Sequence, residues 1–260
     1  MAGSPSVRFA WLAAALLAVK VAHAAESPAD AATATGTAAP TVAESVTIAA
    51  LFPAEEARRL APTMRTDRKV TFRVRIPPGA GPHGILVFVH PGFNAQPMPG
   101  WAEVLDRRDL AYIAAEGFGN DKPGDQRALA ALLALTHLSR TQQIDGARRY
   151  IGGMSGGGKM ASQVMSLFPA FFDGALCIVG ANPIKPDARL APQLAGKRVV
   201  FMTGNKDFNH YDVVAAYKNL VQGGIARAYL IDLPGFGHRY PDAEQLDATL
   251  ALLDPRAEAR

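Results

Sequence analysis

Short apolar runs alternate with longer segments of helical periodicity along most of this chain, and this alternation limits the folds open to it. Seven runs are predicted to be strands, at residues 70–76, 85–89, 110–114, 149–151, 175–179, 198–202 and 228–233. Residues 85–89 and 110–114 are apolar almost throughout, as in strands buried on both faces. The alternation predicts an α/β fold, with a mostly parallel, twisted sheet and helices on both of its faces.

Four segments between the strands have apolar residues at helical spacing. They are residues 127–138, 159–168, 213–221 and 243–253. Pro169 follows the second of these segments and Gly223 follows the third, and both residue types are typical of helix ends. In a sheet of this kind ligands bind at the carboxyl ends of the strands, so functional residues are expected in the loops found there.

The amino-terminal segment is predicted to be an export signal. Arg8 is followed by an apolar run from Phe9 to Val19, and Ala24 closes a group of small residues suited to cleavage. The run is shorter than the roughly 20 apolar residues that a membrane span requires. We expect a signal peptide over residues 1–24, and hence a periplasmic or secreted protein without a stable membrane anchor; an uncleaved anchor is the alternative.

The rest of the chain divides into a leader and one domain. Residues 25–44 are rich in Ala, Thr, Pro and Ser and have almost no large apolar residue, so we expect a flexible leader. Residues 45–260 are expected to form one domain, because single α/β domains often reach roughly 250 residues.

Charge and cysteine content exclude several classes of protein. Removal of Arg8 and Lys20 with the signal peptide lowers the formal net charge from +4 to +2, and the remaining chain has no cluster of basic residues, so no nucleic-acid partner is expected. Cys177 is the single cysteine, which excludes an internal disulfide and a metal site with several cysteine ligands. Its apolar surroundings predict a buried strand residue and not a nucleophile.

The most informative motif lies where the strand at 149–151 turns toward the helix at 159–168. Gly153-Met-Ser155-Gly-Gly157 fits the pattern G-x-S-x-G. When a strand turns at once into a helix, the residues two before and two after the apex approach closely, so small residues are needed there. Ser155 is predicted to occupy a strained turn with its hydroxyl above the sheet, beside the amide of Gly156 at a helix N-terminus.

Nucleotide binding is the alternative interpretation of the same glycines. Gly153 to Lys159 nearly forms a phosphate-binding loop. Met160 argues against that function, because Ser or Thr at this position holds Mg²⁺ and a thioether is a poor ligand for so hard an ion. Asn205-Lys-Asp207 likewise lacks the spacer of the N-K-x-D signature of GTPases.

A nucleophilic serine needs a base and a third group that orients the base. Asp207 follows the strand at 198–202, and His238 follows the strand at 228–233. Their order, Ser then Asp then His, suits an acid and a base on successive strands of an alternating sheet. Asp212 is the rival acid, but it falls in the first turn of a helix, where the helix dipole alone favours a carboxylate.

The loop after residues 85–89 is predicted to supply an oxyanion donor. Gly92 is expected to let the amide of Phe93 turn toward Ser155, where it would act together with the amide of Gly156. A neighbour of Phe93 is the alternative donor. His90 is expected to orient this loop through hydrogen bonds.

Taken together, three motifs resemble those of the α/β-hydrolase family, over roughly residues 46–254. They are His90-Pro-Gly-Phe93, Gly153-Met-Ser-Gly-Gly157, and Gly204-x-x-Asp207 with Gly235-x-Gly-His238. Among small members the chain is similar to exported esterases of the dienelactone hydrolase, polyhydroxybutyrate depolymerase and feruloyl esterase type. The resemblance implies a nucleophile, a base, an acid and two oxyanion donors, namely Ser155, His238, Asp207 and the amides of Phe93 and Gly156. The stretch between Gly180 and Arg198 is too short for the cap that related lipases insert, so no sizeable cap domain is expected.

The expected function is therefore an exported serine hydrolase of carboxylic esters that works through an acyl-enzyme, with no metal and no cofactor. Its substrate would be a small or polymer-attached ester. A peptidase resembling the prolyl-oligopeptidase catalytic domain and a non-catalytic binding protein on a hydrolase scaffold are the alternatives. Candidates to line the pocket, each with a core or surface position as the alternative, are Trp101, Phe118, Phe208 and Tyr211. No sequence feature defines the acyl group, the alcohol group or the oligomeric state.

Overall fold

An eight-stranded sheet forms the centre of the molecule in the computed structural model, which describes residues 40–255. The predicted signal peptide and most of the predicted leader lie outside these residues. The strand order is β1-β2-β4-β3-β5-β6-β7-β8. The pairs β1–β2 and β2–β4 are antiparallel and all other neighbours are parallel. The predicted mostly parallel sheet is therefore confirmed.

The strands are β1 (Val42–Thr47), β2 (Lys69–Arg75), β3 (His83–Val89), β4 (Leu110–Ala115), β5 (Ile144–Met154), β6 (Gly174–Ile178), β7 (Arg198–Lys206) and β8 (Ala228–Gly237). The helices are α2 (Ile48–Leu51), α3 (Ala54–Leu60), α4 (Trp101–Arg107), α5 (Gly124–Thr141), α6 (Gly156–Leu167), α7 (Ala191–Leu194), α8 (His210–Gln222) and α9 (Ala243–Leu253).

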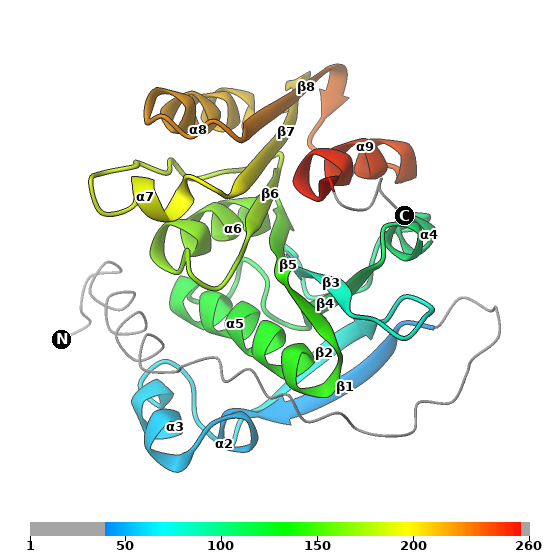
Figure 1. Cartoon of the computed structure of the whole chain (residues 1–260), viewed down its shortest axis with the longest axis vertical. Helices are drawn as coiled ribbons and strands as arrows, with labels where there is room; N and C mark the ends of the chain where they lie inside the picture. The colour runs from blue at the N-terminus through cyan, green and yellow to red at the C-terminus, as the bar shows by residue number, and fades with distance from the viewer. Residues whose placement is uncertain (1–39, 256–260) are drawn as a thin grey trace.

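Helices cover both faces of the sheet. Figure 1 shows α5, α6 and α8 on one face and α4 and α9 on the other. Side chains of a strand point alternately to the two faces, so Ile85 and Val87 of β3 join the first core while Leu86 and Phe88 join the second. Every residue of β3 is buried, as its continuous apolar run predicted.

The folded domain begins earlier than predicted, with a strand that the apolar pattern did not indicate. β1 starts at Val42, so residues 42–44 of the predicted leader pair with β2, in a register that runs from Val42 opposite Val74 to Thr47 opposite Lys69. All of its residues are exposed or half-buried, because β1 is an edge strand. Backbone pairing and not burial defines this strand, and the hydrophobic pattern therefore missed it.

Helix α6 also begins earlier than expected, at Gly156 in place of residue 159. Glycine has low helix propensity, so three glycines in succession, Gly156 to Gly158, did not predict a helical turn. The reason for them is space: a β-carbon at Gly157 would lie 1.8 Å from the Val89 carbonyl oxygen, and one at Gly158 would lie 2.2 Å from that of Gly180.

No large element is inserted between β6 and β7 of the described chain. Between β6 and β7 the chain forms only the four-residue helix α7, in agreement with the prediction of no sizeable cap domain. Within residues 40–255, no helix is long and apolar enough to cross a membrane.

Candidate active site

Ser155 occupies the turn between β5 and α6. Its φ of 57° and ψ of −120° lie outside the regions that residues with a side chain usually adopt, so its backbone is strained. Glycine on either side makes room for this turn, since a β-carbon at Gly153 would lie 2.3 Å from the carbonyl oxygen of Gly157. The backbone N–H of Ser155 donates to the carbonyl of Ile178 at 2.8 Å and holds the turn against β6.

Hydrogen bonds join Ser155, His238 and Asp207 in a chain. The Nε2 atom of His238 lies 2.8 Å from Ser155 Oγ, and its Nδ1 atom lies 2.7 Å from Asp207 Oδ1. Because an ionised carboxylate only accepts hydrogen bonds, Nδ1 carries the proton and Nε2 is free to accept one from the serine hydroxyl. The structure thus brings together three predicted residues that lie far apart in the sequence.

The carboxylate of Asp207 is fully buried and held from several sides. Thr203 donates its hydroxyl to Oδ2 at 2.9 Å, and the backbone N–H of Asn209 donates to Oδ1 at 3.1 Å. Asn209 is itself fixed by a bond from its Nδ2 to the carbonyl of Val179 at 2.9 Å. Sequence reasoning missed Thr203 and Asn209, although an Asp that accepts a bond from the backbone two residues later is a known turn pattern.

The rival acid, Asp212, does not contact His238. It lies in the first turn of α8, and its carboxylate is 3.8 Å from the amino group of Lys159. Nearby, His210 is paired with Asp232 at 2.9 Å. Of the two candidate acids, only Asp207 is hydrogen-bonded to His238.

His90 lies at the end of β3 and is buried between two tyrosines. The hydroxyl of Tyr112 donates to the carbonyl of Ala95 at 2.9 Å, so it accepts from His90 Nε2 at 2.7 Å. The other nitrogen, Nδ1, then accepts from the hydroxyl of Tyr240 at 2.9 Å. Burial lowers the pKa of His90 to about 4, which keeps the imidazole neutral near pH 7. These contacts agree with the hydrogen-bonding role expected for His90.

The loop after β3 is bonded to the loop after β4. The carbonyl of Phe93 accepts from the N–H of Gly117 at 2.9 Å, and that of Pro91 accepts from the N–H of Asn120 at 2.8 Å. Within residues 40–255 the N–H groups of Phe93 and Gly156 donate to no protein acceptor. Both predicted oxyanion donors are therefore available to another acceptor.

Glycine at position 92 is not required by the backbone, contrary to the expectation from sequence. Gly92 does not adopt the left-handed conformation, and a β-carbon built on it would meet nothing within 4 Å. The conformation of this loop depends on its bonds to the neighbouring loop and not on the flexibility of a glycine.

The four aromatic candidates for a pocket lining divide into two pairs. Trp101 and Phe118 are buried in the core, whereas Phe208 and Tyr211 are 77 % and 86 % exposed. The ring of Phe208 stacks on the imidazole of His238, with their centroids 3.9 Å apart. Asn120, which sequence reasoning did not select, lies against Gly156, where its Oδ1 would be 2.0 Å from an added β-carbon.

Cys177 lies in β6 and is fully buried, as predicted. Burial raises the pKa of its thiol to about 12, which leaves it protonated and unreactive. In the part of the chain that the structure describes, no group of three or more His, Cys, Asp or Glu side chains could hold a metal ion.

Solved structures share this architecture. A ferulic acid esterase superposes with a TM-score of 0.60 at 16 % identity, over 84 % of this chain and 97 % of that one. An α/β hydrolase from the metagenome of Lake Arreo, Spain, gives 0.54 at 18 % identity, over 73 % and 77 %. A protein described as a dipeptidyl aminopeptidase IV from Bacteroides ovatus gives 0.58 at 13 % identity, over 83 % of this chain and 36 % of that one.

These superpositions establish that the chain has the α/β-hydrolase fold, as its motifs suggested. No protein-family model matches the sequence, and neither does any curated protein. At such low identities the similarity defines the fold, and the chemistry must be argued from the site itself.

Proposed function

We propose that this protein is an exported serine hydrolase that cleaves carboxylic esters, with Ser155 as the nucleophile, His238 as the base and Asp207 as the acid that orients the base. One observation carries the proposal: the hydrogen-bonded chain from Ser155 Oγ through His238 to the buried carboxylate of Asp207. A serine hydroxyl is a weak nucleophile when protonated, and a base in direct contact with it removes that obstacle.

In the first half of the proposed reaction, Ser155 Oγ attacks the ester carbonyl carbon while His238 Nε2 takes the hydroxyl proton. The C–O bond to the alcohol then breaks, and the imidazolium returns the proton to the departing alkoxide. Asp207 accepts a hydrogen bond from the Nδ1–H group throughout, which keeps Nε2 directed at the serine and stabilises the positive charge of the imidazolium.

In the second half, a water molecule attacks the acyl-enzyme. His238 Nε2 takes one proton from the water as its oxygen bonds to the acyl carbon, and it then gives that proton to Ser155 Oγ as the acyl bond breaks. The free acid leaves and the serine is restored, so the cycle needs only the ester and water.

The amides of Phe93 and Gly156 are the proposed donors to the oxyanion of the tetrahedral intermediate. Their N–H groups form no bond within the described protein, and Gly156 also begins helix α6, whose positive dipole end favours a negative charge. Loss of one such donor typically costs about 2.7–4 kcal/mol of barrier lowering.

The described chain has no cap inserted between β6 and β7, which suits an accessible acyl group better than interfacial lipid. An ester is favoured over a peptide because a ferulic acid esterase shares the fold over 97 % of its own length. The dipeptidyl aminopeptidase neighbour, by contrast, is matched over 36 % of its chain. We propose a small or polymer-attached ester that reaches Ser155 from solvent.

Covalent labelling tests the nucleophile. The folded protein is incubated with a fluorophosphonate, and the modified peptide is located by mass spectrometry. We expect the label on Ser155 and none in the Ser155→Ala variant. A folded wild-type protein that remains unlabelled at Ser155 would rule out the proposed chemistry.

A matched substrate panel tests the reaction. The p-nitrophenyl esters of increasing acyl length are compared with the corresponding anilides, using wild type, Ser155→Ala and His238→Gln. We expect ester turnover only in the wild type, with the anilides at least about tenfold slower in kcat/KM, a gap of about 1.4 kcal/mol in barrier. Faster anilide cleavage would favour the peptidase alternative, whereas binding without turnover would favour the non-catalytic one.

Export is tested separately. The full chain is expressed in a Gram-negative host, and the amino terminus of the periplasmic protein is sequenced. We expect it to begin at Ala25; a membrane-bound product that keeps Arg8 would show an uncleaved anchor.

A further inference from the structure

Arg127 is a buried cation next to the candidate site. It lies in the first turn of α5, and 7 % of the residue is exposed. Within residues 40–255 no carboxylate lies within ion-pair distance of it, and its guanidinium bonds backbone carbonyls. Burial lowers the pKa of this group, and the negative charge of Asp121 opposes that shift only in part.

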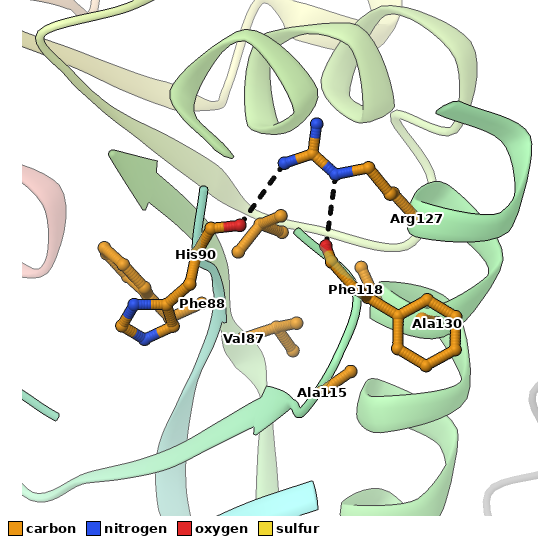
Figure 2. Close-up of a pocket in the computed structure, with 9 residues that line it drawn as sticks. Val87, Phe88, His90, Ala115, Phe118, Arg127 and Ala130 are labelled. Carbon is orange, nitrogen blue, oxygen red and sulfur yellow. Dashed lines mark hydrogen bonds between the residues drawn. The ribbon is translucent and has the colours of Figure 1, made fainter. Parts of the chain in front are cut away.

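The guanidinium joins the ends of two strands. Its Nε donates to the carbonyl of Phe118 at 3.2 Å, and its Nη2 donates to the carbonyl of His90 at 3.3 Å, as Figure 2 shows. His90 directly follows β3, and Phe118 lies in the loop after β4. One side chain therefore fastens together the two loops that lie beside Ser155.

The same two loops touch along their backbones. Besides the two backbone hydrogen bonds between them, a β-carbon at Gly119 would lie 2.7 Å from the carbonyl oxygen of Pro91. The position of the Phe93 amide thus depends on the loop after β4. Arg127 is bonded to both loops, through the carbonyls of His90 and Phe118, and is itself buried.

Substrate binding does not account for Arg127. The cavity beside it has a volume of about 10 Å³ and is lined by residues such as Val87, Phe118 and Ala130. A space of about 10–15 Å³ holds one water molecule at most, so no ester group can enter. The guanidinium therefore binds backbone carbonyls of the protein and does not contact the substrate.

We propose that Arg127 is a positioning residue for the oxyanion side of the site. By bonding the carbonyls of His90 and Phe118 at once, it holds the loop that presents the Phe93 amide to the reacting carbonyl. A guanidinium suits this task because its donors lie in one rigid plane and reach two acceptors together, whereas an ammonium group is a point donor on a flexible stem. The inference rests on the proposed hydrolase function.

The test compares three variants of the full chain with wild type. Arg127→Met removes both bonds and keeps the apolar stem, and Arg127→Lys keeps the charge with a single point donor. The control is Arg140→Met, on the same helix, because Arg140 also donates to a backbone carbonyl, that of Leu51, away from the site. The measurements are kcat and KM for a p-nitrophenyl ester, Ki for a trifluoromethyl ketone, and the unfolding temperature.

An oxyanion donor acts in the transition state, so the variants should differ in kcat and not in KM. We expect Arg127→Met to lower kcat about 10- to 100-fold, since small displacements of reacting groups can cost about 100-fold. KM should stay within about threefold, while Ki for the ketone should rise in parallel with the loss of kcat. The kcat of Arg127→Lys should lie between those of wild type and Arg127→Met. Arg140→Met should lower the unfolding temperature without changing kcat.

A folded Arg127→Met variant with the kcat and the ketone Ki of wild type would overturn the inference, as would a change in KM alone. If Arg127→Met does not fold, Arg127→Lys takes its place, and its kcat and ketone Ki are compared with those of wild type in the same way. Failure of the proposed function is recognised separately, because wild type would then show no turnover that depends on Ser155, and the role of Arg127 would fall with it.

Discussion

Contact between two backbones determines the residue at position 157. A β-carbon there would lie 1.8 Å from the carbonyl oxygen of Val89, which is the last residue of β3 and immediately precedes His90. Any side chain must therefore displace either the first turn of α6 or the end of β3. Both changes would move Ser155 relative to the Phe93 loop.

We predict that Gly157→Ala lowers kcat about 100-fold even where the protein still folds, because a displacement of about 1 Å in reacting groups costs this much. The measurement is kcat for a p-nitrophenyl ester, with circular dichroism to establish folding. Gly196→Ala is the matched control, since a β-carbon at Gly196 meets nothing within 4 Å. An active Gly157→Ala variant would show that the close approach at this turn is relaxed easily.

At the scale of elements, the loop that carries His238 is fixed from the opposite half of the sheet. The indole N–H of Trp101, in α4, donates to the carbonyl of Pro241 at 3.0 Å. Tyr240 donates to His90 at the end of β3, and its ring packs against that of Trp101 with centroids 5.9 Å apart. His90 thus connects the loop of the proposed base to the loop of a proposed oxyanion donor.

This connection predicts a pH dependence of stability. The pKa of His90 is about 4 in the folded protein and about 6.5 in an unfolded chain, so between these values the unfolded state binds more protons. The free energy of unfolding should therefore fall as the pH is lowered from about 6.5 to 4, by on the order of 3 kcal/mol from this group. Above about pH 6.5 the contribution of His90 is fully present and constant.

Urea unfolding of wild type and His90→Gln at several pH values between 4 and 7.5 measures this contribution. The variant cannot titrate at this position, so its free energy of unfolding should change less steeply over the same range. Equal slopes in the two proteins would show that His90 is not held neutral by the fold.

At the scale of the whole molecule, a buried ion pair joins the central strand β5 to the residue that follows the last helix, α9. Arg148, near the amino-terminal end of the parallel part of β5, donates to Asp254 at 2.7 Å, and their side chains are 4 % and 0 % exposed. Tyr150 donates to the same carboxylate at 3.2 Å. Asp254 directly follows α9, so the pair attaches the last helix to the centre of the sheet.

We predict that Arg148→Met destabilises the protein by about 3–5 kcal/mol, because it leaves the Asp254 carboxylate buried without its cation. The double variant Arg148→Met/Asp254→Leu should recover part of this loss, since it removes both charges. Denaturant unfolding measures the free energies, and kcat of the folded variants should stay near the wild-type value. A double variant less stable than Arg148→Met would contradict this account.

The course of the fold could be predicted from local patterns, because strands and helices leave their periodicity in the sequence. The continuous apolar run of β3 and the helical spacing within α9 each predicted an element that the structure contains. Glycines at positions 153 and 157 predicted the turn at Ser155, because the need for close backbone approach is itself a local property. The edge strand β1 was not predicted, because its exposed residues carry little hydrophobic signal.

By itself, then, the sequence determined the alternating α/β architecture and the order in which a serine, an acid and a base occur at strand ends. The sequence also favoured Asp207 over Asp212 as the acid. Only the tertiary structure revealed that Thr203 and Asn209 hold Asp207. It also revealed that Arg127 joins the loops after β3 and β4. The physical reason is the range of the interactions. Burial and backbone geometry act between near neighbours in the chain and leave a local pattern, whereas a hydrogen bond between distant side chains depends on distances that only the folded molecule sets.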